Sequence, residues 1–117
     1  MSRDHRKLRV FDFADSLVVD VYRASALFPS TERFGLQTQV RRAAVSAAAN
    51  IVEGCARRTT GEYVNFLNVA TGSAAEAGYL LDLAVRLEFL PKTVHQPLAA
   101  RYTELVKGLK KLVASFD

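Results

Sequence analysis

The sequence predicts an all-α protein, an up-and-down antiparallel four-helix bundle that forms a single domain over residues 1–117. Apolar residues recur at spacings of three and four along most of the chain, which is the helical period. No segment alternates apolar and polar side chains for long enough to predict a half-buried strand. The pattern breaks near residues 29–35, 57–59 and 91, which leaves four helices with short connections, as in simple bundles.

The first helix is expected over residues 12–28. Asp12 is its expected N-cap, and Pro29 ends it because the residue before a proline avoids the helical conformation. The preceding residues, 1–9, carry a net charge of +3 and are expected to form a mobile basic tail. An apolar stripe for the core runs along one face of the helix, at Val10, Ala14, Leu17, Val21, Ala24 and Phe28.

The second helix is expected to begin between residues 31 and 36 and to end near residue 55. Residues 43–52, with the sequence AAVSAAANIV, carry no charged side chain. A helix that is apolar on every side is not covered by one partner face, so this segment needs neighbours on more than one side.

The third helix is expected over residues 60–87 and is uncharged over residues 63–75. It contains Gly72 and Gly78, each of which costs about 1 kcal/mol relative to alanine, so we expect both to admit a close neighbour. The fourth helix is expected to start near residue 93 or 96, with Pro97 in or before its first turn. Its apolar stripe is Leu98, Tyr102, Leu105, Leu109, Leu112 and Phe116.

The two middle helices carry more apolar surface than a monomer of this size can bury, and large exposed apolar patches are rare on monomers. The sequence therefore predicts a homo-oligomer. The alternative is that small alanines tolerate exposure to solvent. That alternative requires five larger residues to lie mostly inside one bundle, namely Val45, Ile51, Val52, Val64 and Val69.

The net charge of +4 is concentrated at the two ends of the chain, because residues 92–117 also carry +3 while residues 10–91 carry −2. Clustered lysines and arginines neutralise phosphates with little reading of base sequence, which makes RNA or DNA a candidate partner. The alternative is a solvated charged face. The candidate nucleic-acid-binding residues are Arg41, Arg42, Arg57, Arg58, Lys107, Lys110 and Lys111.

A polar seam interrupts the apolar second helix at steps of four, three and four, formed by Ser46, Asn50, Glu53 and Arg57. Ser73 and Glu76 offer partners from the third helix. A carboxylate inside a bundle costs several kcal/mol unless it is paired, so both glutamates are expected to find hydrogen-bond donors. We favour a structural network here over the alternative, a metal or small-molecule site around Asn50, Glu53 and Glu76.

Nothing in the sequence indicates an enzyme, and no cofactor or metal is expected. Di-metal bundles use Glu-x-x-His pairs, which the chain lacks, and His5 and His95 have no ligand at metal-binding spacing. Cys55, the single cysteine, has no histidine base on its segment, and it is compatible with the reducing cytoplasm. The longest uncharged run, residues 63–75, is shorter than the roughly 20 residues that span a bilayer, so no membrane partner is expected.

Residues 33–90 resemble the bacterial four-helix-bundle proteins named for 23S ribosomal RNA intervening sequences. The matching elements are FGL at 34–36, RRAAVS at 41–46, NIVEG at 50–54, the arginine-rich loop with a glutamate at 57–62, FLNVATGSAAE at 66–76 and the leucine-rich run at 80–90. The polar and glycine residues of this pattern, expected to be mainly structural, are Gln39, Ser46, Asn50, Glu53, Gly54, Glu62, Gly72, Ser73 and Glu76.

Three departures from the family pattern stand out. Val52 replaces an alanine, Ala48 replaces a common proline, and Ala77 with Gly78 replace a Leu-Glu pair. The loss of that second glutamate weakens a paired-carboxylate site on the third helix.

The resemblance also implies an assembly. Members of the family form closed rings of five bundles, and a related accessory protein of diversity-generating retroelements is a basic ring that contacts nucleic acid and a reverse transcriptase. The resemblance therefore implies a homopentamer that associates with RNA or DNA. A scaffold whose partner is another protein, such as a reverse-transcriptase-like enzyme, without direct nucleic-acid contact, is the alternative.

Overall fold

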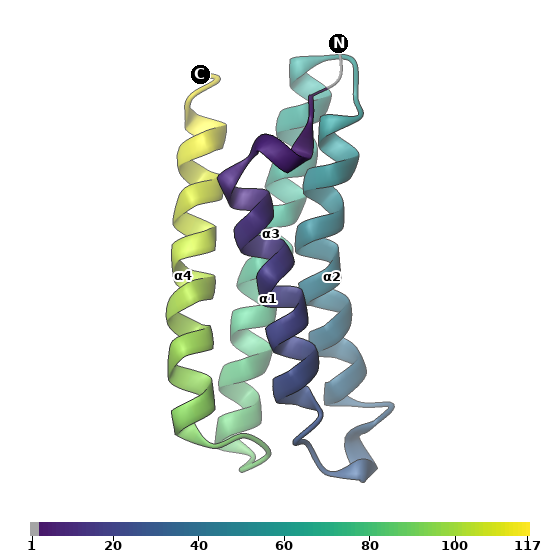
Figure 1. Cartoon of the computed structure of the whole chain (residues 1–117), viewed down its shortest axis with the longest axis vertical. Helices are drawn as coiled ribbons and strands as arrows, with labels where there is room; N and C mark the ends of the chain where they lie inside the picture. Colours follow the sequence, from purple (N-terminus) through teal and green to yellow (C-terminus); the bar gives the residue numbers. More distant parts are fainter. Residues whose placement is uncertain (1–2) are drawn as a thin grey trace.

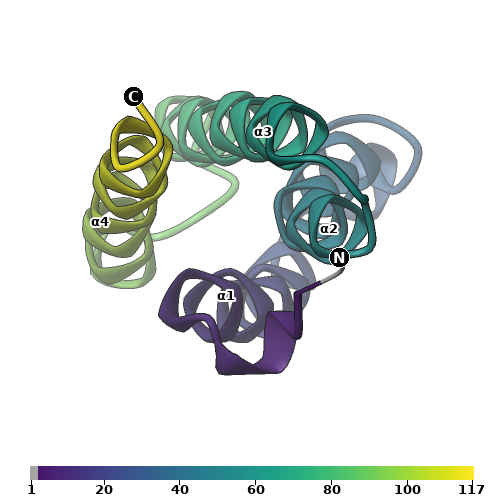
Figure 2. The ribbon, with the colours of Figure 1, turned by 90° about the horizontal axis from the view of Figure 1, so that it is seen from above.

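The computed structural model describes residues 3–117 and has four helices that run alternately up and down: α1 (Arg9–Ser25), α2 (Leu36–Cys55), α3 (Thr60–Arg86) and α4 (Lys92–Ala114) (Figure 1). Two short 3-10 turns, η1 (His5–Lys7) and η2 (Ser30–Glu32), precede α1 and α2. Seen from above, the helices occupy four corners in chain order (Figure 2). Residues 3–117 contain no strand, and the predicted all-α four-helix bundle is confirmed.

The start of α1 differs from the prediction, since the helix begins at Arg9 and the N-cap position is Leu8, which makes no side-chain capping bond. Asp12 is therefore not the N-cap; it lies in the first turn. The physical reason is η1, whose own cap, Asp4, accepts a hydrogen bond from the Arg6 amide and turns the chain directly into α1. The helix ends at Ser25, and a tight turn leads to Pro29.

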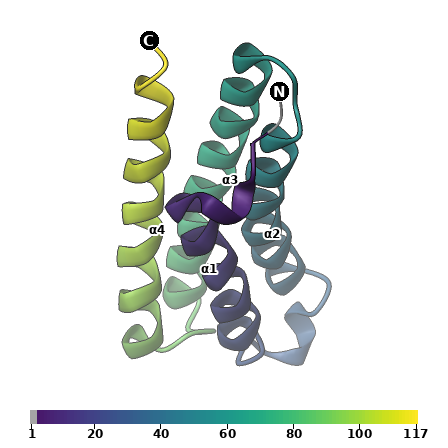
Figure 3. The same ribbon diagram turned by 45° about the horizontal axis from the view of Figure 1, so that its top comes forward.

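Part of the basic N-terminal segment lies on the bundle (Figure 3). The amide of Arg3 donates to the carbonyl of Cys55 at the end of α2, at 2.7 Å. The mobility expected for residues 1–9 stays a prediction, and residues 1–2 lie outside the described residues.

The ends of α3 and α4 follow from local chemistry. Thr59 caps α3 by accepting from the Glu62 amide, and its hydroxyl donates to the Glu62 carboxylate, which is a variant of the capping box. After α3, Glu88 takes a positive φ of 63° and reverses the chain. The next helix begins at Lys92, earlier than predicted, so that Pro97 lies inside α4 instead of at its start.

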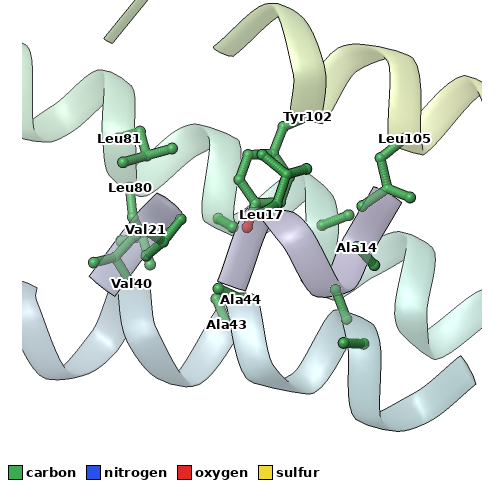
Figure 4. Packing of buried hydrophobic residues seen from close by; sticks show 14 of the residues in the cluster. Ala14, Leu17, Val21, Val40, Ala43, Ala44, Leu80, Leu81, Tyr102 and Leu105 are labelled. Atoms are coloured by element: carbon green, nitrogen blue, oxygen red, sulfur yellow. The ribbon is translucent and has the colours of Figure 1, made fainter. Parts of the chain in front are cut away.

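The core is built from the predicted stripes of α1 and α4, except that Phe116 lies beyond the end of α4 and is 39% exposed, and from alanines and larger apolar residues of α2 and α3 (Figure 4). Ala43, Ala47, Ala70 and Ala77 are almost fully buried, so α2 and α3 pack closely. Tyr102 projects from α4 into this core, and its hydroxyl is buried without a hydrogen-bond partner among the described residues.

The monomeric alternative required five apolar residues of α2 and α3 to lie mostly inside one bundle, and their exposure differs. Ile51 is buried, and Val52 and Val64 are half-buried. Val45 and Val69 remain 41% and 46% exposed. One bundle thus leaves part of the apolar surface of α2 and α3 uncovered.

In the described part of the chain, no helix combines the length and the apolar character that a bilayer crossing needs.

Candidate nucleic-acid interface

The connection between α2 and α3 carries two of the predicted arginines. The Arg57 guanidinium lies over the Phe66 ring, 4.7 Å from its centroid, and its Nη2 is 2.6 Å from Oε1 of Glu53. Its Nε is buried and finds no hydrogen-bond partner among residues 3–117. Arg58 is exposed. Arg57 is thus held against α3, and Arg58 follows it in the same loop.

The N-terminal segment brings further cations to this end of the bundle. The Arg3 guanidinium lies 4.1 Å from the centroid of the Tyr63 ring and 5.7 Å from that of Phe116, so it joins the start of α3 to the end of α4. Arg6 forms an ion pair with Asp4 at 2.9 Å, and the hydrogen bonds from Arg6 hold the pKa of Asp4 below its usual value. Lys7 and Arg9 are exposed.

The C-terminal part of α4 adds the predicted lysines. Lys107, Lys110 and Lys111 are all exposed, and Lys111 lines a groove with Arg9 of α1. The N-terminal segment from Arg3, the C-terminus and the α2–α3 connection lie at the same end of the molecule (Figures 1 and 3). We call this end the basic end and define it by Arg3, Arg6, Lys7, Arg9, Arg57, Arg58, Lys110 and Lys111.

The other predicted pair, Arg41 and Arg42, lies in the first half of α2, away from the basic end. Arg41 is used within the fold: its Nε donates to the Ser25 hydroxyl at 2.8 Å, its Nη2 donates to the Tyr22 carbonyl, and its guanidinium lies over the Tyr22 ring. Arg42 is exposed. The structure therefore separates these two arginines from the other candidates and gives Arg41 a role in joining α1 to α2.

The polar seam lies at the outer edge of the α2–α3 contact. Ser46 and Ser73 share a hydrogen bond of 2.8 Å, and the Asn50 side-chain amide donates to the Ser46 carbonyl and hydroxyl. Glu53 and Glu76 are exposed, so the expectation of carboxylates inside the bundle was wrong. Because residues 43–52 of α2 carry no charge, the sequence pattern does not indicate which side of the helix faces the core. In the structure the seam lies on the outer side of the helix pair.

The alternative was a metal or small-molecule site around Asn50, Glu53 and Glu76, and this arrangement offers few groups that could hold such a ligand. Glu53 is taken up by its ion pair with Arg57. Among residues 3–117, no three histidine, cysteine, aspartate or glutamate side chains come close enough to hold a metal ion.

The remaining motif residues have different surroundings. Gln39 is exposed, and Glu62 completes the cap of α3. Gly54 is buried where a Cβ would meet the Phe66 Cβ at 2.9 Å. A close neighbour was expected at both Gly72 and Gly78. Among the described residues, no atom lies within 4 Å of a Cβ built at Gly72. At Gly78, a Cβ would lie 3.7 Å from the Tyr102 Cβ, which is an ordinary van der Waals contact.

Sequence reasoning missed Arg101, which joins α4 to α1. Its guanidinium forms an ion pair with Asp20, donates to the Ser16 hydroxyl at 2.7 Å and lies over the Phe13 ring. The only signal in the sequence was its place on the polar side of α4, and that signal does not distinguish it from the solvated lysines. Lys7 and Arg9 were predicted only as members of a basic tail.

The fold and the basic end define this chain as a small four-helix-bundle protein. The family model of the 23S rRNA-intervening sequence protein matches residues 6–111, and the chain belongs to this family. Among solved structures, it is similar to a protein of unknown function from the S23 ribosomal protein family of Bacteroides thetaiotaomicron. The two are 25% identical with a TM-score of 0.83, and the match covers 89% of this chain and 97% of the other. A search of curated proteins gave no match.

Proposed function

We propose that this protein is a non-enzymatic, homopentameric scaffold that associates with RNA or DNA through its basic end. The observation that carries the proposal is that basic groups from three distant segments, the N-terminal segment, the α2–α3 loop and the end of α4, lie at one end of the bundle (Figure 1). Family membership supports the assembly, because the resemblance to the 23S rRNA-intervening sequence proteins implies a closed ring of five bundles.

The chemistry of this end suits phosphates better than bases. Most of the exposed charges are lysines and arginines; Tyr63 is buried, Phe66 is half-buried beneath Arg57, and the exposed Phe116 ring packs against Tyr63 and Arg3. Cations that neutralise phosphates release counterions and give affinity without sequence reading. A ring would repeat this surface once per subunit, and several weak contacts on one nucleic acid would add up through their high effective concentration.

The experiment measures binding of a structured RNA hairpin by fluorescence anisotropy at several salt concentrations between about 50 and 200 mM. We expect affinity to fall steeply with salt. The double variant Arg58→Ala with Lys111→Ala, at the basic end, is expected to bind more weakly and to flatten the salt slope by about 1 for each lost phosphate contact.

The matched control removes the same charge from the opposite end, with Arg33→Ala and Lys92→Ala, which are both exposed. It is expected to bind almost as the wild type does. No binding at low salt, or an equal loss in the control, would contradict the role of the basic end.

The oligomeric state has its own measurement. Light scattering coupled to size-exclusion chromatography is expected to give the mass of five chains of 12.9 kDa each. A single-chain particle at micromolar concentration would contradict the scaffold.

The second candidate is a scaffold for another protein without nucleic-acid contact. It is favoured by a groove of about 510 Å³ between α3 and α4, lined by Ala75, Gly78, Tyr79, Ala99 and Val106 among others. An affinity capture from nuclease-treated lysate that recovers a protein partner, together with no RNA binding by the purified protein, would support this candidate over the first.

A further inference from the structure

Gly72 lies near the middle of α3, and nothing in the described chain explains why it is a glycine. A Cβ built there meets no atom within 4 Å. A glycine inside a helix weakens that helix relative to alanine, because glycine has more conformational freedom to lose on folding. Gly54 differs, since its own chain leaves no room for a Cβ. Gly61 is equally open but lies in the first turn of α3, whereas Gly72 leaves space for something outside this subunit in the middle of the helix.

The side of α3 around Gly72 is exposed and nearly neutral. We call it the α3 outer face and define it by Asn65, Asn68, Val69, Gly72, Ala75 and Glu76, all of which are exposed. Val69 is the large apolar residue of the face, and Glu76 carries its charge. The face is thus a shallow apolar surface with a carboxylate towards one end.

A complementary side occurs on α2. We call it the α2 outer face and define it by Arg42, Val45, Ala49 and Glu53, which recur at steps of three and four and are all exposed. Val45 stands out from this face, and Arg42 carries a positive charge beside it. Arg42 on one face and Glu76 on the other carry opposite charges, each near an apolar centre, while Glu53 of the α2 outer face is paired with Arg57 of its own subunit.

The register of α2 and α3 places the two centres within about 3 Å of each other in height along the bundle. Ser46 and Ser73 are hydrogen-bonded across the helix pair. Val45 and Gly72 each lie one residue from this bond but on opposite sides of it, so their heights differ by about 3 Å, while Arg42 and Glu76 lie one turn from it in the same direction along the bundle, because the helices are antiparallel. Figure 2 shows the two helices at adjacent corners. A second copy rotated about an axis parallel to the bundle keeps these heights, so its Val45 comes within about 3 Å of the height of Gly72, which is within the reach of a valine side chain.

We propose that the α3 outer face of one copy receives the α2 outer face of a second copy, with Val45 packed on the backbone at Gly72 and Arg42 beside Glu76. The proposal rests on the homo-oligomer of the proposed function and assigns its contact surface. The contact joins two different faces, so repeated copies make a head-to-tail assembly that closes into a ring when the rotation allows.

The first test is Gly72→Leu, measured by light scattering and circular dichroism. The subunit has room for the leucine, so helix content is expected to stay at the wild-type level, while the leucine blocks the approach of Val45 and the mass falls to that of one chain. Ala100→Leu is the matched control, because it adds the same side chain at an exposed small residue of α4. It is expected to keep the wild-type mass.

The second test reverses the charges. Arg42→Glu and Glu76→Arg are each expected to weaken the assembly at least tenfold in dissociation constant, and the double variant is expected to recover most of that loss. This pair decides the question even where Gly72→Leu does not fold.

The outcomes separate the two proposals. A monomeric wild type would overturn both the oligomer and its surface. A wild-type oligomer whose mass survives Gly72→Leu, or whose assembly is indifferent to the charge reversals, would overturn this surface and leave the oligomer in place.

Discussion

Ser46 of α2 and Ser73 of α3 share a hydrogen bond of 2.8 Å between their hydroxyl oxygens. The bond joins two helices whose buried side chains include many alanines. Small apolar side chains allow close packing but specify little about how far one helix slides along the other. A directional bond between hydroxyls, supported by the Asn50 amide that donates to Ser46, specifies that register.

Ser46→Ala or Ser73→Ala removes this bond, and each is expected to lower the free energy of unfolding by about 1 kcal/mol. The measurement is urea denaturation followed by circular dichroism. In the double variant the loss is expected to be smaller than the sum of the single losses, because both substitutions remove the same bond. Ser115→Ala, at an exposed position beyond α4, is the control, and a purely additive double variant would contradict a direct coupling.

Gly54→Ala is expected to destabilise the protein by about 1–3 kcal/mol, because the added methyl overlaps the Phe66 Cβ and lies 3.3 Å from the Tyr63 carbonyl oxygen. Gly61→Ala is the matched control. Nothing lies within 4 Å of a Cβ at that position, and alanine favours the helix, so stability is expected to stay equal or to rise. Thermal melting of both variants checks the contrast, which fails if the two substitutions have the same sign.

Tyr102→Phe is expected to raise the free energy of unfolding by about 1 kcal/mol, because it removes a buried hydroxyl that finds no partner among residues 3–117. The gain should grow in alkali. Burial raises the pKa of Tyr102, so the folded state holds the phenol neutral, and wild-type stability falls as the pH rises above the unfolded tyrosine value of about 10. Melting curves of the wild type and the variant at neutral and alkaline pH test this. An unchanged difference between them across that range would count against it.

The sequence predicted the fold because its strongest signals are local. The apolar stripe of α1, the start of α3 at Thr60 and the end of the same helix near Arg86 each depend on neighbours within a few turns. The start of α1 was misjudged because a short 3-10 turn before the helix replaced the side-chain cap assigned to Asp12.

The candidate site was harder to predict because it depends on contacts between distant residues. Over the uncharged residues 43–52 of α2 and 63–75 of α3, the sequence pattern does not indicate which side of each helix faces the core, so Glu53 and Glu76, which follow these runs, were placed inside although they are exposed. The clusters of Arg41 with Ser25 and of Arg101 with Asp20 join residues 16 and 81 positions apart. No spacing rule separates such arginines from those that remain on the surface.

The N-terminal segment can be tested through Cys55, whose carbonyl accepts the Arg3 amide and whose thiol is 1% exposed. Burial also raises the pKa of this thiol, so little thiolate is present near neutral pH. We expect the native protein to react slowly with a thiol reagent and the unfolded protein to react quickly.

Arg3→Ala removes the stacking on Tyr63 and Phe116, which is worth about 0.5–1 kcal/mol, so the segment is expected to open more often and labelling of Cys55 to accelerate about two- to fivefold. Arg6→Ala is the control, because Arg6 is exposed and pairs with Asp4 in its own segment. Its labelling rate is expected to match that of the wild type. Equal labelling rates in all three proteins would contradict this prediction. They would mean that the segment is already detached from the bundle in the wild type and does not protect Cys55, so that removing Arg3 changes nothing.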